Sequence, residues 1–215
     1  MNTKSSSREA NDHRARLLKA MAATVGAKGY ASVTIADVVR HACVSKRTFY
    51  EHFESKEACF LALFRAASQS GLRVLRDAVV PDRPWQPQLE EALGRYFEHL
   101  AASPGLLRTL HVEVFQLGHQ GEQARRQVVD DMASFMCSTV NRPQPGLLSS
   151  VSKPLSHDMA TAAVGAINEL VLRLIERDTM ESLPNLTPLA TRIVRVLTEV
   201  LEEIPVDTRE QVPVT

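Results

Sequence analysis

Hydrophobic and polar positions follow a helical period along almost the whole chain. Apolar residues recur every three or four positions, and no stretch alternates with a period of two for long enough to predict a β-strand. In residues 11–28, for example, Leu17, Leu18, Met21 and Val25 form one apolar stripe. The pattern therefore predicts an all-α protein.

Cap residues and helix breakers divide this pattern into separate helices. Thr34 followed by Asp37 fits a capping box, Ser45 and Ser55 are suitable N-cap residues, and Gly29 favours a left-handed stop. With the breaks at proline, the helices expected are 11–28, 35–41, 45–53, 55–80, 88–102, 104–117, 121–140, 155–177 and 188–204. Residues 1–9, the linker 81–87, the loop 141–154 and the tail 205–215 are expected outside helices, with the two ends frayed or disordered.

The net charge of zero hides an uneven distribution of charge. Residues 1–56 contain ten Lys and Arg against five Asp and Glu, whereas the rest of the chain contains fifteen against twenty. A basic first quarter joined to an acidic remainder indicates a head that binds a polyanion. The alternative is a chance distribution of solvated charges.

Two short predicted helices in the basic part are joined only by Ala42-Cys43-Val44. This arrangement is typical of a helix-turn-helix, whose second helix enters the DNA major groove. Lys46 and Arg47 begin that second helix, where side chains meet base edges and Arg can pair with guanine O6 and N7. The other candidate DNA contacts, mostly groups suited to phosphate oxygens, are Thr34, Ser45, Thr48, Tyr50, His52 and Lys56.

Two aromatic residues in the same stretch have a different expected role. Phe49 and Phe53 are four residues apart and share one face of the second helix, so we expect them to pack on the preceding helices. Tyr50 lies on another face, which leaves its hydroxyl free for a phosphate.

The segment from Leu17 to about Leu61 resembles the TetR family of transcriptional regulators. The resemblance lies in Gly29-Tyr30, Thr34-Ile35, Val38, Ala42 and above all the run VSKRTFYEHFESKE, which begins at Val44. It implies a helix-turn-helix DNA-binding domain at residues 1–54 and a larger helical effector-binding and dimerisation domain at residues 55–204. It also implies a homodimer on a palindromic operator, most often a repressor that a small molecule releases.

Two positions depart from the family pattern. Cys43 stands where the family usually has Gly at the turn, and a non-Gly residue with positive φ costs about 1 kcal/mol. Val39 replaces the usual Ala between the two helices, so their packing is expected to be slightly wider. Neither change removes a candidate DNA contact.

The rest of the chain supplies candidates for the effector site and the dimer interface. Helices 155–177 and 188–204 carry wide apolar stripes, which suit a four-helix dimer interface or simply one core. Glu113 and Glu169 are flanked by apolar residues and either suits a cationic ligand, although an exposed face or an Arg partner is the commoner arrangement. The candidate effector-binding residues are Phe97, His111, Phe115, Met132, Phe135, Met136 and Asn168. For Phe and Met at helical spacing, a place in the core is the alternative.

Other function classes receive little support from the sequence. It has no G-x-S-x-G, P-loop, GxGxxG or HExxH motif, so neither an enzyme nor a bound cofactor is predicted. A zinc site from His41, Cys43, His52 and Cys59 would occupy the recognition helix, and no metal is predicted.

The three cysteines are expected to be reduced and to pack as small hydrophobic residues. No apolar run long enough for a membrane span and no secretory leader is recognised, so a cytoplasmic protein is expected. A DNA-binding regulator without a small-molecule ligand remains an alternative.

Overall fold

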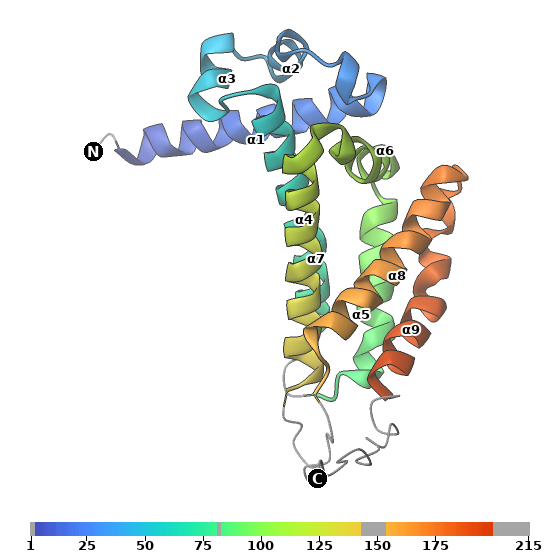
Figure 1. Ribbon diagram of the computed structural model, residues 1–215. Helices are drawn as coiled ribbons and strands as arrows, with labels where there is room; N and C mark the ends of the chain where they lie inside the picture. Colours follow the sequence, from blue (N-terminus) through green and yellow to red (C-terminus); the bar gives the residue numbers. More distant parts are fainter. Residues whose placement is uncertain (1–2, 81–82, 143–153, 200–215) are drawn as a thin grey trace, which may run out of the picture.

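The structure, a computed structural model, describes residues 3–80, 83–142 and 154–199. These residues form helices and no strand, which confirms the all-α prediction. Figure 1 shows a head formed by the N-terminal helices, among them the long helix α1, and a helical body below it. One helix of about the length of the body, α4, runs from the head down into the body.

The head and body are built from helices of very different lengths. The head contains α1 (Thr3–Lys28), the 3₁₀ turn η1 (Tyr30–Ser32), α2 (Ile35–Ala42) and α3 (Lys46–His52), and α4 (Lys56–Ala78) follows. The body continues with α5 (Gln86–Ala101), α6 (Pro104–Arg108), the π turn η2 (Thr109–Glu113), the 3₁₀ turn η3 (Val114–Leu117), α7 (Gly118–Val140), α8 (His157–Glu176), the 3₁₀ segment η4 (Met180–Leu186) and α9 (Thr187–Glu199).

The expected helices differ from the structure by one to three residues at most ends and by more at three places. Helix α1 begins at Thr3, so the expectation that residues 1–9 lie outside the helix is wrong from residue 3 onward; no Gly or Pro there breaks the helix. The single helix expected at 104–117 is divided into α6, η2 and η3. The segment η4 was not expected. The tail 205–215, most of the loop 141–154 and the last five residues of the helix expected at 188–204 lie outside the described residues.

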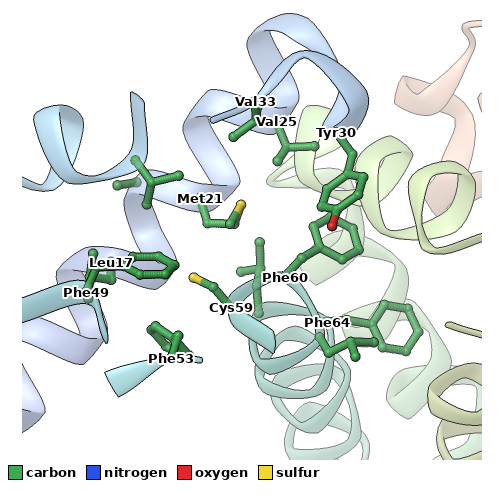
Figure 2. Packing of buried hydrophobic residues seen from close by; sticks show 14 of the residues in the cluster. Leu17, Met21, Val25, Tyr30, Val33, Phe49, Phe53, Cys59, Phe60 and Phe64 are labelled. Atoms are coloured by element: carbon green, nitrogen blue, oxygen red, sulfur yellow. The ribbon is translucent and has the colours of Figure 1, made fainter. Parts of the chain in front are cut away.

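The head has its own hydrophobic core. The fully buried rings of Phe49 from α3 and Phe60 from α4 pack with Leu17 and Met21 from α1, as Figure 2 shows. Phe53 is also buried, which confirms that this face of α3 packs inward. Burying a side chain of this size stabilises the fold by about 1.5–3 kcal/mol, so the head core fixes how α3 sits on α1.

A second cluster holds the body together. Phe97 of α5 and Leu183 of η4 are fully buried in it, with Val171 of α8 and Val194 of α9. Trp85, expected in a linker, is buried against the same cluster. The segment before α5 is therefore anchored to the body core.

The break between α6 and α7 depends on a glycine. A Cβ added to Gly121 of α7 would lie 1.9 Å from the Val114 carbonyl oxygen, so α7 approaches the 3₁₀ turn too closely for any side chain.

We expect Gly121→Ala to lower the free energy of unfolding by about 1–3 kcal/mol, the usual cost of overpacking. At Gly105 of α6 an added Cβ meets nothing within 4 Å, so Gly105→Ala should be neutral or slightly stabilising. Urea unfolding of both variants measures the difference, and equal stability would contradict the close approach.

Candidate functional site

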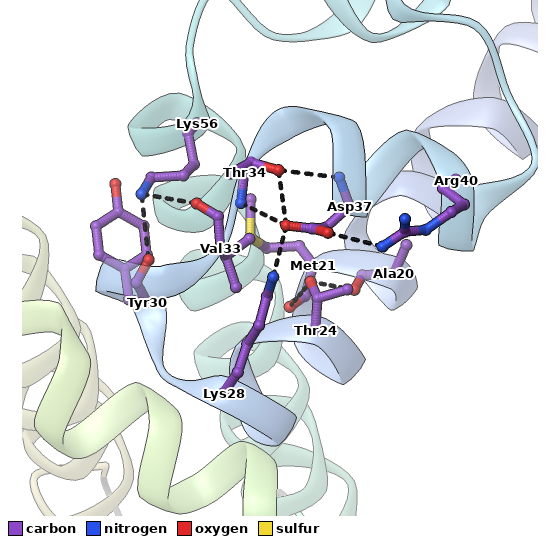
Figure 3. A network of polar contacts seen from close by, with 10 residues as sticks. All are labelled: Ala20, Met21, Thr24, Lys28, Tyr30, Val33, Thr34, Asp37, Arg40 and Lys56. Atoms are coloured by element: carbon purple, nitrogen blue, oxygen red, sulfur yellow. Dashed lines mark hydrogen bonds and ion pairs between the residues drawn. The ribbon is translucent and has the colours of Figure 1, made fainter.

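The start of α2 is held by a network around one carboxylate. Asp37 Oδ2 accepts hydrogen bonds from Lys28 Nζ at 2.6 Å, from Thr34 Oγ1 at 2.6 Å and from the Thr34 backbone N–H at 2.9 Å, as Figure 3 shows. The Thr34 hydroxyl in turn accepts from the Asp37 N–H, which confirms the capping box. The hydrogen bonds from Lys28 and Thr34 hold the pKa of the Asp37 carboxyl well below its usual range. Thr34 therefore has a structural role, and its predicted DNA contact stays a prediction.

Hydrogen bonds from a side chain of α1 hold the turn between α2 and α3 in place. Cys43 is left-handed, with φ 52° and ψ 48°, as the sequence predicted for this non-Gly position. Arg16 of α1 donates to the carbonyl oxygens of Ala42 and Cys43 at 2.5 and 2.9 Å. The Ser45 hydroxyl accepts from the Thr48 N–H, which confirms it as the N-cap of α3. These contacts orient the first turn of α3.

Helix α3 presents Lys46, Arg47 and Tyr50 to solvent. Lys46 is exposed, and the side chain of Arg47 is 90% exposed even though its Nε lies 3.1 Å from Glu51 Oε1. Tyr50 is 56% exposed, whereas its neighbour Phe49 is fully buried. Because an exposed i,i+4 ion pair contributes only about 0.3–0.5 kcal/mol, Glu51 does not hold Arg47 away from a nucleic acid.

Hydroxyl and imidazole groups lie beside these residues. The Ser45 and Thr48 hydroxyls are 2.9 Å apart at the first turn of α3. The His52 ring is edge-on to the His13 ring of α1, with centroids 6.4 Å apart. These three residues, which are predicted to contact phosphates, therefore lie at the two ends of one short helix.

Lys56, predicted to contact DNA, is engaged inside the head. Its ammonium donates to the carbonyl oxygens of Tyr30 at 3.1 Å and Val33 at 3.0 Å, and it lies 4.2 Å from the centre of the Tyr30 ring (Figure 3). These contacts tie the start of α4 to the segment that leads into α2. Sequence reasoning missed this role because the partners are more than 20 residues away along the chain.

The body contains a cavity of about 470 Å³ directly below the head. Helices α4, α5, α7 and α8 and the segment 103–115 surround it. Four predicted effector-binding residues line it: His111, Phe115, Met132 and Asn168. Four other wall residues, Leu63, Phe64, Leu110 and Val114, also belong to the head core. The cavity wall and the head core are thus one packed unit.

A smaller cavity of about 110 Å³ adjoins the first and is lined mostly by apolar residues. Phe135 and Met136 line it, as does Trp85. The residues that line both cavities are Tyr96, Val128, Met132 and Asn168. Phe97, also predicted as a ligand contact, lines neither of these two cavities, because its side of α5 faces the body core.

Most polar groups in the larger cavity are uncharged at neutral pH. Burial lowers the pKa of His111, whose Nδ1 lies 3.1 Å from the Leu107 carbonyl oxygen. Burial raises the pKa of Tyr96 to about 12. The acid of the wall, Glu169, accepts a hydrogen bond from Arg173 at 3.2 Å. The cation of the wall is Arg125, whose guanidinium lies 5.6 Å from the centre of the Phe115 ring. The cavity therefore combines a mainly neutral interior with one cation and one paired acid.

Glu113, the other acid noted in the sequence, is not part of the cavity wall. Its Oε2 accepts from the backbone N–H of Tyr30 at 3.3 Å and from Gln116 Nε2 at 2.5 Å. It thus joins the π turn of the body to the head.

The cysteines differ in their surroundings. All three are free thiols. Cys59 lies in the head core, where burial raises its pKa to about 12. Cys43 is exposed, so the expectation that it packs as a buried hydrophobic residue is wrong, because it occupies the left-handed position of the turn.

In residues 3–80, 83–142 and 154–199, no group of three or more His, Cys, Asp and Glu side chains is arranged to hold a metal ion. Among those residues, too, no helix is long and apolar enough to cross a membrane.

Known proteins resemble this chain in sequence at the head and in fold over most of its length. Residues 17–63 match the family described as bacterial regulatory proteins, tetR family. The fold is similar to the fatty acid degradation regulator FadR from Bacillus halodurans, with a TM-score of 0.72 and 16% identity over 89% of this chain and 97% of that chain. It is similar to FadR from Bacillus subtilis in complex with stearoyl-CoA, with a TM-score of 0.66 and 17% identity over 83% and 96% of the two chains. The regulatory protein TetR from Rhodobacter sphaeroides gives a TM-score of 0.62 and 20% identity over 86% and 96%. At these identities the likeness establishes the fold. No curated protein matches the chain in sequence.

Proposed function

We propose that the chain is a DNA-binding transcriptional regulator, since residues 17–63 match the tetR family of bacterial regulatory proteins, and that it is a repressor that a small molecule releases from its operator. Helix α3 enters the major groove, Lys46 and Arg47 contact base edges, and Tyr50 contacts a phosphate. One observation carries the ligand response: Leu110 and Val114 line the cavity and also pack in the head core. A ligand that displaces them repositions the head.

The operator-binding form is a homodimer through α8 and α9. Leu189 and Val196 of α9 are 46% and 45% exposed, which leaves apolar surface unpaired in the single chain. Gly165 and Ala166 are exposed on α8 and permit close approach of another helix. A two-fold arrangement of these helices in two chains covers this surface and presents two copies of α3 to a palindrome.

The effector is a molecule with a long apolar chain and a polar head. Two features support this assignment. The smaller cavity is apolar and shares wall residues with the larger one, so together they suit an extended ligand with its apolar end inward. The similar FadR from Bacillus subtilis binds stearoyl-CoA. Arg125, at the wall of the larger cavity, then lies near the polar head.

The experiment is a binding measurement with and without a candidate effector. An operator is first selected from random duplexes, and its Kd is then measured with stearoyl-CoA and with coenzyme A alone as the control. We expect stearoyl-CoA to weaken operator binding by about 5–150-fold, the usual range of allosteric coupling, and coenzyme A alone to have no effect. Equal Kd values in all three conditions would favour a regulator that does not respond to acyl chains.

A further inference from the structure

A single carboxylate connects the cavity region to the DNA-binding head. Glu113 ends the π turn η2, and its Oε2 accepts from the Tyr30 N–H at 3.3 Å across a separation of 83 residues. Gly29 lies next to this contact, since an added Cβ there would be at van der Waals distance, 3.4 Å, from Glu113 Oε1, and its φ of 76° is a conformation that favours glycine. The chain thus brings the body's carboxylate directly against the backbone at the end of α1.

The residues around Glu113 belong to the cavity. Leu110 and His111 precede it, Val114 and Phe115 follow it, and all four line the larger cavity. In a π turn the backbone hydrogen bond spans five residues (i→i+5), one more than in an α-helix, and such turns are frequent at functional sites. A ligand that presses on these four side chains therefore acts on the segment that positions the Glu113 carboxylate.

Tyr30 also contacts other residues of the head. Its carbonyl oxygen and ring both contact Lys56, and its hydroxyl donates to Glu57 Oε1 at 3.0 Å. Lys56 also binds the Val33 carbonyl oxygen, immediately before Thr34, the N-cap of α2. The position of Tyr30 therefore fixes the start of both α2 and α4 (Figure 3).

From this geometry we propose that the Glu113–Tyr30 hydrogen bond is a latch that holds the head in its operator-binding position while the cavity is empty. The ligand opens the latch by repacking the π turn, and the start of α2 then moves with Tyr30. This inference rests on the proposed function for its ligand. The latch itself is a property of the empty protein, so it can be tested without a ligand.

Three variants isolate the latch from the cavity wall. Glu113→Ala removes the acceptor, whereas Glu113→Gln keeps an acceptor oxygen at the same reach. Gln116→Ala removes the other partner of the same carboxylate and leaves the Tyr30 contact in place. Thermal unfolding of all three variants identifies any general loss of structure.

The ligand-free arm measures amide hydrogen exchange at Tyr30 and operator affinity. We expect Glu113→Ala to speed exchange at Tyr30 and to weaken operator binding, each by about tenfold or more, as for a lost hydrogen bond to a charged group. Glu113→Gln should lie between Glu113→Ala and the wild type, and Gln116→Ala should stay within about twofold of the wild type. If Glu113→Ala matches the wild type in both measurements, the latch is overturned, whatever the effector is.

The second arm adds stearoyl-CoA to each protein. We expect the ratio of operator Kd with and without stearoyl-CoA to fall by about fivefold or more in Glu113→Ala, while stearoyl-CoA still binds with wild-type affinity. An undiminished ratio in Glu113→Ala would show that the signal takes another route. A wild type that binds its operator equally with and without stearoyl-CoA would instead count against the proposed effector, and the ligand-free arm would still decide on the latch.

Discussion

Replacing Phe49 with Ala is expected to lower the free energy of unfolding by about 3–5 kcal/mol, as for other buried Phe residues. Phe49 is fully buried and contacts Tyr50 and Phe53 with ring centroids 5.6 and 5.8 Å apart. It is a central contact of α3 with the head core, because α3 has only seven residues and its other face is exposed. Urea unfolding followed by circular dichroism measures the loss.

The neighbouring residue supplies the control. Tyr50→Phe keeps the ring beside Phe49 and removes only an exposed hydroxyl, so its stability should lie within about 0.5 kcal/mol of the wild type. Its DNA binding should weaken to the same extent for operator and unrelated duplexes, because a phosphate contact carries no sequence information. A Phe49→Ala variant as stable as Tyr50→Phe would show that α3 is not held by this core.

Replacing Arg47 with Ala is expected to weaken operator binding by about 1–3 kcal/mol and to relax the base preference at one pair in each half-site. The physical reason is that a guanidinium at the first turn of a recognition helix can pair with two acceptors of one guanine. Arg47 is free to do so, since its side chain is 90% exposed and its partner is the exposed Glu51. Titration of the operator and of its single-base variants measures both effects.

Arg95→Ala is the matched control for Arg47→Ala. Arg95 also forms an exposed i,i+4 pair, with Glu91, but it lies on α5 in the body. Its loss should leave operator affinity unchanged within about twofold, as expected for an exposed ion pair away from the interface. If Arg47→Ala and Arg95→Ala bind the operator equally well, the base contact assigned to Arg47 is wrong.

The head could be predicted largely from its sequence because its signals are local. The capping box of Thr34 and Asp37 and the caps at Ser45 and Ser55 each join residues three positions apart. The inward face of α3 follows from the four-residue spacing of two Phe residues. Such contacts depend on the helix itself and not on the rest of the fold.

Contacts between distant segments could not be predicted in the same way. Nothing near Glu113 indicates that it binds the Tyr30 backbone, and nothing near Lys56 indicates that two carbonyl oxygens of the η1 region hold it. The division of 104–117 into three segments depends on how closely Gly121 approaches Val114. Helical periodicity describes one element at a time, so it misses these features.

The cavity was predicted only in part for the same reason. Met132 and Asn168 face it from α7 and α8, whereas Phe97, an apolar residue at helical spacing like Met132, faces the body core. Which side of a helix meets a cavity depends on the packing of its neighbours. The predicted DNA contacts and effector contacts stay predictions until they are measured.

The central claim, that α3 reads duplex DNA by sequence, is tested most directly by selecting bound duplexes from a random pool with the purified chain at moderate ionic strength. The proposed homodimer predicts enrichment of one inverted repeat, with half-site centres about 34–36 Å apart or a multiple of that distance. Recovery of duplexes with no shared sequence, in the same proportions as the starting pool, would contradict it.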